Sequence, residues 1–202
     1  MTFFDYFQTA LVVIVVCVIA IRAISSWIAT GVNPIVVGRG QGSWRVLEFF
    51  SLVAVILWVI EVLLRAFGSR FEIFPGAVGV AQLHTPAVRI VGVALLMIGM
   101  VPFILAFVNF GTSWRIGIDR KTPGTLVTTG IFAFTRNPIF VAFILFFFGV
   151  FLLNGTWFFL IFALLAVVAI HFQILREEDF LRKQYGADYA EYHRRTARYL
   201  IW

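Results

Sequence analysis

The chain has few charged residues and almost no cysteine. Charged residues make up 13% of its 202 residues, whereas an ordinary soluble domain has about a quarter. The single cysteine, Cys17, excludes an internal disulfide framework and a cysteine-based metal site. Its three histidines, at positions 84, 171 and 193, have no ligand spacing, so the sequence predicts no metal site.

Apolar residues are correspondingly abundant and fall in long runs. They make up 61% of the chain, far more than a soluble core needs. Since a transmembrane helix takes about 20 mostly apolar residues, five stretches qualify or come close: 5–29, 44–67, 86–109, 138–153 and 156–175. We therefore expect an all-α integral membrane protein with about five transmembrane helices and a cytoplasmic helical tail.

The ends of two of these stretches are informative. No basic segment precedes the first stretch and no small-residue cleavage site follows it, which indicates a retained helix and not a signal peptide. Only Asn154 and Gly155 separate the fourth stretch from the fifth. Asn-Gly is a turn sequence, so these two helices should form a tight antiparallel hairpin.

The basic residues indicate how the helices are oriented. Cytoplasmic flanks are enriched in Lys and Arg. Of the 16 Lys and Arg residues, three (Arg65, Arg70 and Arg89) fall on one side and Arg22 lies inside the first helix. The other twelve share the opposite side: Arg39, Arg45, Arg115, Arg120, Lys121, Arg136, Arg176, Arg182, Lys183, Arg194, Arg195 and Arg198. This predicts an external N-terminus and a cytoplasmic tail. The same orientation applies to a bacterial inner membrane and to an endoplasmic reticulum, which the sequence does not distinguish. Because the basic residues flank helices and form no separate module, no nucleic-acid partner is expected.

Two regions on the predicted cytoplasmic side are polar. The linker 111–138 is too long for a simple connection between bundle helices, and the tail from Arg176 concentrates acids, bases and tyrosines. The hairpin joins them, so they should meet at its cytoplasmic mouth. We accordingly divide the chain into a three-helix transmembrane region, 1–110, and a catalytic region, 111–202, made of a cofactor-binding linker, the hairpin and the tail.

A few ionisable residues lie within or beside the apolar stretches. Glu61 and Arg65 are four residues apart, a spacing that favours a local ion pair. Glu48 near an inner helix end either reaches the membrane surface or faces a cavity. His171 shares a helix face with Glu178, and either looks toward the same place as that acid or makes an interhelical hydrogen bond.

The linker and tail together carry a family resemblance. The runs LVTTGIF at 126–132 and TRNPIF at 135–140 are followed by Glu177-Glu178, Leu181, Tyr185-Gly186, Tyr189, Tyr192 and Arg198. This ordered pair of motifs resembles the isoprenylcysteine carboxyl methyltransferase family, which is related to the phospholipid N-methyltransferases and more distantly to the sterol reductases. The resemblance covers roughly residues 111–200. It implies a membrane-embedded methyltransferase that uses S-adenosylmethionine and a lipophilic acceptor from the bilayer.

The resemblance also implies roles for particular residues. Arg136 or a tail arginine would pair with the cofactor carboxylate, since guanidinium matches carboxylate geometry. The paired acids would meet its ammonium and ribose, and the backbone of 126–130 would frame its adenine. The implied cofactor-binding residues are Leu126, Val127, Gly130, Arg136, Asn137, Pro138, Glu177 and Glu178. Glu178 and His171 are the catalytic candidates, and Trp114 and Arg198 the substrate-binding ones.

Three positions depart from the family pattern. The family's Arg-His-Pro-x-Tyr reads here as Arg136-Asn137-Pro138-Ile139-Phe140. Asn137 can hydrogen-bond but cannot titrate, and Phe140 lacks a hydroxyl. Ile201 stands near the place of the family's terminal proline.

The residues leave the methyl acceptor open. A carboxylate is already nucleophilic, whereas an amine or thiol needs a base, for which Glu178 or His171 is the candidate. Two other functions remain to be compared: a reductase using NADPH, as in the usually larger sterol reductases, and a non-catalytic membrane scaffold of the same fold.

The distribution of basic residues makes a prediction about topology. A reporter fused after Trp202 should read cytoplasmic and one before Met1 external, because twelve basic residues flank one side against three on the other. Reporter activity in intact cells measures this. A cytoplasmic reading at both ends would require an even number of spans and would contradict the five-helix arrangement.

Overall fold

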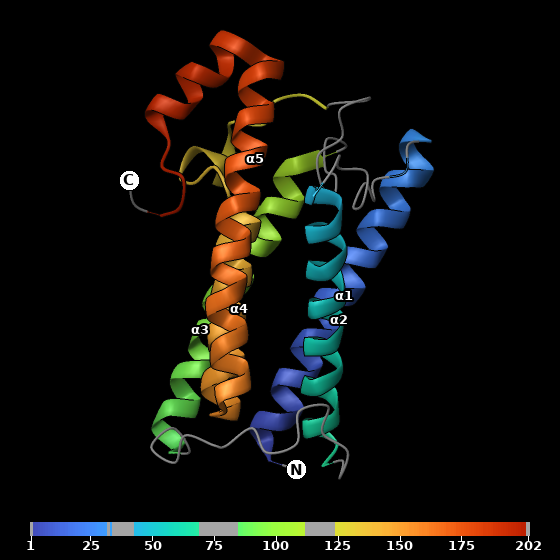
Figure 1. Ribbon diagram of the computed structural model, residues 1–202, viewed down its shortest axis with the longest axis vertical. Coiled ribbons are helices and arrows are strands. Elements are labelled where there is room, and N and C mark those ends of the chain that lie inside the picture. Colours follow the sequence, from blue (N-terminus) through green and yellow to red (C-terminus); the bar gives the residue numbers. More distant parts are fainter. Residues whose placement is uncertain (1, 32, 34–42, 69–84, 112–123, 201–202) are drawn as a thin grey trace.

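The computed structural model describes residues 2–31, 33, 43–68, 85–111 and 124–200, which form a helical bundle (Figure 1). Its elements are α1 (Phe3–Thr30), α2 (Ser43–Ala66), α3 (Pro86–Phe110), the 3-10 turn η3 (Gly130–Ala133), α4 (Pro138–Asn154) and α5 (Trp157–Arg195). Within these ranges four helices are long and apolar enough to cross a membrane, and α4 is a shorter apolar helix. Among the described residues there is no strand, only an isolated bridge between Thr135 and Ala197. The expected all-α membrane fold is confirmed.

Helices α3 and α4 pack at close range through glycines. A Cβ atom on Gly92 would lie 2.9 Å from the backbone oxygen of Gly149, and one on Gly149 would lie 3.0 Å from that of Gly92. Further along α3, a Cβ on Gly99 would lie 2.9 Å from the ring of Phe146. Lipid offers helices no hydrophobic drive to associate, so such close backbone approach is what gives the pair its cohesion.

The predicted hairpin between α4 and α5 is confirmed. Gly155 ends α4 in the left-handed conformation, with φ 60° and ψ 34°, and its N–H donates to the Phe151 carbonyl at 2.7 Å. Asn154 Nδ2 donates to Gln8 Oε1 of α1 at 2.8 Å. This contact fixes the turn to the first helix and covers a polar side chain that would otherwise face lipid.

Helix α2 packs against the hairpin through Trp58. The Trp58 ring meets Phe147 of α4 edge-on at 5.1 Å and stacks on Phe162 of α5 at 5.7 Å between centroids. Further along α2, Arg65 Nε lies 2.7 Å from Glu61 Oε1. The local ion pair that their spacing predicts is therefore present.

Helix α5 is much longer than the predicted fifth span. The apolar part ends near Leu175, but the helix continues without a break at Arg176 because no Gly or Pro interrupts it before Gly186. Gly186, with φ 52° and ψ −117°, is non-helical and turns the chain. The last helical segment then leads away, and the residues after it descend beside α5 (Figure 1).

The start of the chain lies at the opposite end of the bundle from η3 and this returning tail (Figure 1). We call the end that carries η3 and the tail the tail end. All the polar motifs of the linker and tail that the structure describes lie there.

Candidate functional site

The last part of the linker is fixed to α3 by Asn109. Asn109 Oδ1 accepts the N–H of Ile131 at 2.8 Å, at the start of η3. Gly130 has φ 63°, and a Cβ there would clash with Asn109 Oδ1. Both the positive φ and the close contact require glycine at this position. Gly130 thus sets the path of the linker. Asn109 was not predicted from the sequence, where only its position as a polar residue in the last turn of an apolar helix marks it.

The linker and the tail are joined by backbone and side-chain bonds. Thr135 and Ala197 form a parallel bridge, and the Arg136 N–H donates to the Ala197 carbonyl at 2.9 Å. Thr135 Oγ1 and Asn137 Nδ2 both donate to the Arg198 carbonyl, at 3.3 and 3.0 Å. Asn137, where the family has histidine, therefore serves here as a neutral donor to the tail.

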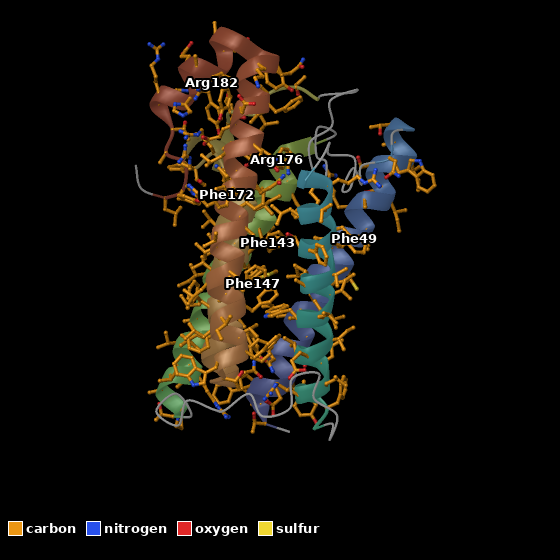
Figure 2. All side chains as sticks on the ribbon, viewed as in Figure 1. Phe49, Phe143, Phe147, Phe172, Arg176 and Arg182 are labelled. Atoms are coloured by element: carbon orange, nitrogen blue, oxygen red, sulfur yellow. The ribbon has the colours of Figure 1, made fainter. Side chains whose placement is uncertain are left out.

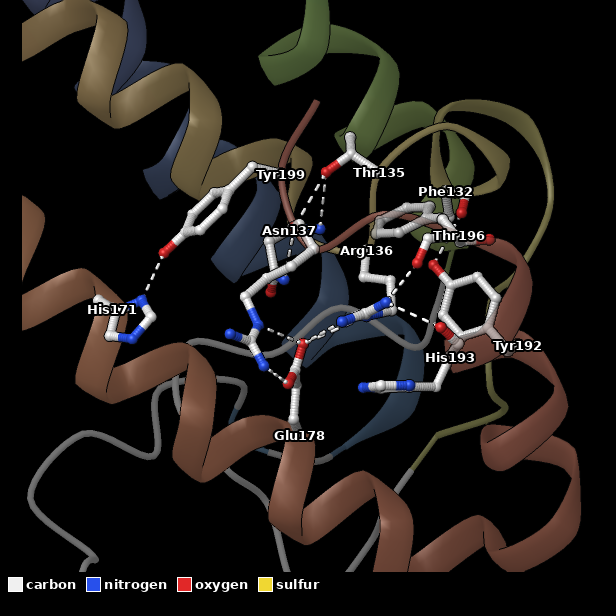
Figure 3. A network of polar contacts seen from close by, with 11 residues as sticks. Phe132, Thr135, Arg136, Asn137, His171, Glu178, Tyr192, His193, Thr196 and Tyr199 are labelled. Atoms are coloured by element: carbon white, nitrogen blue, oxygen red, sulfur yellow. Dashed lines mark hydrogen bonds and ion pairs between the residues drawn. The ribbon is translucent and has the colours of Figure 1, made fainter. Parts of the chain in front are cut away.

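Glu178 of α5 holds an arginine from each of these two segments (Figure 3). Arg136 Nη2 lies 2.8 Å from Glu178 Oε1, and Arg198 Nη2 lies 2.8 Å from Glu178 Oε2. The side chains of Arg136 and Glu178 are each 6% exposed, against 33% for Arg198. The expected meeting of linker and tail therefore centres on one buried carboxylate between two guanidinium groups.

This pairing determines the acidity of Glu178. Burial alone would raise its pKa, but hydrogen bonds from Arg198 and Arg136 outweigh burial and hold the pKa below its ordinary value of 4.5. The group is thus charged at neutral pH, with both oxygens occupied. Such a carboxylate is a weak base.

Arg136 makes more contacts than the sequence suggests. Besides Glu178, its Nη1 donates to the carbonyls of His193, at 3.1 Å, and Thr196. All three guanidinium nitrogens are thus engaged by the protein itself. Arg136 holds the returning tail, and the more exposed Arg198 is the better placed of the two to reach a ligand.

Three tyrosines of the tail face the linker in different ways. The Tyr185 hydroxyl donates to the Gly124 carbonyl, and the Tyr192 hydroxyl to the Phe132 carbonyl at 2.7 Å. Tyr189, between them, is 0% exposed, and its hydroxyl has no hydrogen-bond partner among the described residues. Leu126 and Val127, two of the implied cofactor-binding residues, pack against the cluster that Tyr189 forms with Phe132 and Tyr192.

The second of the paired acids belongs to a different network. Glu177 Oε1 accepts from Gln173 Nε2 at 2.8 Å, and Gln173 Oε1 accepts from Arg176 Nη1 at 3.1 Å. Arg176 points from α5 toward α2 (Figure 2), where its Nη2 lies 2.9 Å from Glu48 Oε1. Burial raises the pKa of Glu177 to about 7, although Gln173 and Arg176 oppose the shift.

His171 contacts the tail one residue beyond Arg198. Its Nδ1 lies 2.9 Å from the Tyr199 hydroxyl, and the two rings stack at 6.4 Å. His171 and Glu178 do share a face of α5, as predicted, and both hold the tail (Figure 3). His171 thus looks toward the same segment as Glu178, and its hydrogen bond goes to the non-helical tail and not to another helix.

The remaining predicted residues are placed as follows. Pro138 is fully buried as the first residue of α4. Trp114 lies outside the described residues, as do all of 112–123. Within the described part of the chain, no three His, Cys, Asp or Glu side chains gather into a possible metal site.

A comparison with protein families finds a match over the second half of the fold. The family model described as phospholipid methyltransferase matches residues 87–188. This is half of the chain, and it runs from α3 through η3 and the hairpin past Glu178 and Tyr185, ending before Tyr189 and Arg198. No curated protein and no solved structure matches the chain.

The charge arrangement around Glu178 predicts a pH-dependent loss of stability. Glu178→Gln should lower the free energy of unfolding by about 3 kcal/mol at neutral pH, because it leaves the buried Arg136 without its anion. The partial exposure of Arg198 keeps this figure at the low end of the range for buried pairs. Because the Glu178 pKa is lower in the folded protein than the 4.5 of the unfolded chain, its charge stabilises the fold above about pH 4.5. This stabilisation is lost as the pH falls through the pKa of the folded protein. The difference from wild type should therefore shrink below about pH 4.5. Thermal unfolding in detergent across this range measures it.

Glu191→Gln provides the matched control. Glu191 is 68% exposed and pairs with Arg195 at 3.7 Å, so the same chemical change should alter stability by less than about 0.5 kcal/mol. A Glu178→Gln protein as stable as the Glu191→Gln control at pH 7 would contradict the role given to the carboxylate.

Proposed function

The chain belongs to the phospholipid methyltransferase family, and we propose that it transfers a methyl group from S-adenosylmethionine to a lipophilic acceptor in the membrane. The observation that carries this proposal is the junction at Glu178, where the two segments of the family resemblance meet through Arg136 and Arg198. The family match makes the chain a membrane methyltransferase in broad class. The cofactor, the acceptor and the roles of individual residues are our inferences.

We infer that the catalytic region corresponds to 111–202, with 1–110 as its membrane support. Glu178 and the groups that surround it in the described residues come from the linker, α5 and the tail. Asn109 and Ala106 of α3 contribute from the first region, by holding η3 and by packing against Tyr189 and Tyr192. Following the distribution of basic residues, we assign the tail end to the cytoplasm, where S-adenosylmethionine is made.

The donors at this site suit the cofactor. Two guanidinium groups against one carboxylate leave an excess positive charge beside Glu178, which favours a carboxylate ligand. Arg198 is exposed enough to make that contact while Arg136 holds the tail in place. Leu126 and Val127, which are half-buried, offer apolar surface for the adenine.

When bound, the cofactor supplies an electrophilic methyl group on a positively charged sulfur. The reaction is an in-line displacement, so the protein accelerates it chiefly by alignment and by excluding water. The returning tail contributes to both alignment and the exclusion of water. Thr135 and Asn137 fix its path over the start of α4, and His171 fixes Tyr199 against α5. We assign these residues to positioning.

The two acids divide the work of binding and proton transfer. Glu178 is a weak base because its pKa is depressed and its oxygens are occupied. His171 is occupied by Tyr199. Glu177 has a pKa raised to about 7, near the value that a base needs at neutral pH. We therefore propose Glu177 for any base function, which an amine or thiol acceptor would need, and site organisation for Glu178. Because Glu177 contacts Gln173, which in turn contacts Arg176 on the side of α5 that faces α2, this role requires the acceptor to approach from that side.

Ligand binding tests the proposal. Purified protein in detergent should bind S-adenosylmethionine and should not bind NADPH, as measured by isothermal titration calorimetry. Binding of NADPH alone would support the reductase, and tight binding of neither would support a non-catalytic scaffold. Either result would overturn the proposed activity.

A kinetic prediction separates the two acids. With an amine or thiol acceptor, Glu177→Gln should lower the rate at saturating cofactor by roughly 10²–10⁴-fold, the usual contribution of a general base. The wild-type rate should rise as pH increases through about 7, because a raised carboxyl pKa keeps the base protonated below that value, and the variant should lose this dependence. Gln173→Glu, Glu177→Gln, which moves the acid one turn along α5, serves as the control. A Glu177→Gln enzyme with the wild-type rate and pH profile would exclude the base role.

A further inference from the structure

The Tyr189 hydroxyl is a buried donor with no acceptor in the part of the chain that the structure describes. Tyr189 is 0% exposed, and its hydroxyl has no partner within the described residues. The hydroxyl groups of Tyr185 and Tyr192, before and after it in the tail, donate to linker carbonyls. Leaving a buried hydroxyl unsatisfied costs about 1–3 kcal/mol, so such a group in an otherwise well-bonded site calls for a ligand.

The surroundings of this hydroxyl indicate what kind of group it meets. Arg136, Arg182 and Arg198 all act on Tyr189 electrostatically, against the single acid Glu178. The excess of positive charge favours an anion. Burial, followed by Glu178, raises the pKa of Tyr189 to about 12, so the phenol keeps its proton and acts as a donor.

The packing of Tyr189 also places it among the residues assigned to the cofactor. Its ring lies 6.1 Å from that of Tyr192 and 6.0 Å from that of His193, whose backbone carbonyl accepts from Arg136. Leu126 and Val127 cover the same cluster. S-adenosylmethionine carries one anionic group, the carboxylate of its methionine part.

On these grounds, and resting on the proposed function, we propose that the Tyr189 hydroxyl donates a hydrogen bond to the methionine carboxylate of bound S-adenosylmethionine. Arg198 then neutralises the charge of that carboxylate, and Tyr189 fixes its orientation. Tyr189 is thus a binding residue, and it favours the binding of cofactors that carry the amino-acid part over nucleosides that lack it.

The test compares two ligands in Tyr189→Phe. S-adenosylhomocysteine keeps the carboxylate and cannot react, whereas methylthioadenosine lacks the whole amino-acid part. Loss of a hydrogen bond to a charged group should weaken binding of S-adenosylhomocysteine roughly tenfold to a hundredfold. Binding of methylthioadenosine should not change. Isothermal titration calorimetry measures both.

The stability of the ligand-free protein supplies a second readout. Tyr189→Phe removes an unsatisfied hydroxyl, so its melting temperature should equal or exceed that of wild type. Tyr192→Phe, the same change three residues on, removes the bond to the Phe132 carbonyl and should melt lower. A merely structural role for Tyr189 predicts that both variants melt lower.

The opposite results distinguish a wrong assignment of Tyr189 from a wrong proposed function. Unchanged affinity for S-adenosylhomocysteine, equal weakening of both ligands, or destabilisation like that of Tyr192→Phe would overturn the assignment of Tyr189 while leaving the proposed function intact. A wild-type protein that binds neither S-adenosylmethionine nor S-adenosylhomocysteine would overturn the proposed function, and this inference with it.

Discussion

One buried carboxylate joins the three parts of the chain that form the tail end. Glu178 sits on α5, and the arginines that it holds come from the linker and from the returning tail. A buried ion pair is weak evidence for stability, because desolvation offsets much of the Coulomb attraction. Its geometric effect is stronger, since two guanidinium groups on two oxygens allow few alternative arrangements. The bridge at Thr135 and the bonds of Asn137 follow from this arrangement, because they require the tail to lie where Arg198 places it.

The membrane fold was largely predictable because lipid restricts the choices. Backbone groups in hydrocarbon must be satisfied within each helix, so long apolar runs such as that of α3 can be identified from hydropathy alone. Asn154-Gly155 likewise defines the hairpin by local turn chemistry. The end of α5 was not predictable in this way. Hydropathy marks where the apolar part stops, but the helix continues in water until Gly186 breaks it.

The site was predictable in its parts but not in its pairings. The motifs predicted that Arg136, Glu178 and Arg198 lie in one region, but no feature of the motifs indicated that both arginines hold the same acid. Both Glu177 and Glu178 were assigned to the cofactor, and Glu178 also to catalysis, although consecutive residues of a helix point about 100° apart and so meet different neighbours. That geometry sends Glu177 toward Gln173 and the Arg176–Glu48 pair, and Glu178 toward the tail. Asn109 escaped detection because only its contact with Ile131 distinguishes it from an ordinary polar residue at a helix end.

The short length of α4 has a consequence for the surrounding bilayer. Its 17 residues span about 25 Å, less than the roughly 30 Å of a typical hydrocarbon layer. Asn154 at the far end is covered by Gln8, so that end does not extend the span by exposing a polar side chain to lipid. Every residue of α4 is at least partly buried, so the bilayer meets its neighbours and does not have to thin around it. The longer helices α3 and α5 set the span of the bundle, and the polar Asn137 before the start of α4 is surrounded by protein and not by hydrocarbon.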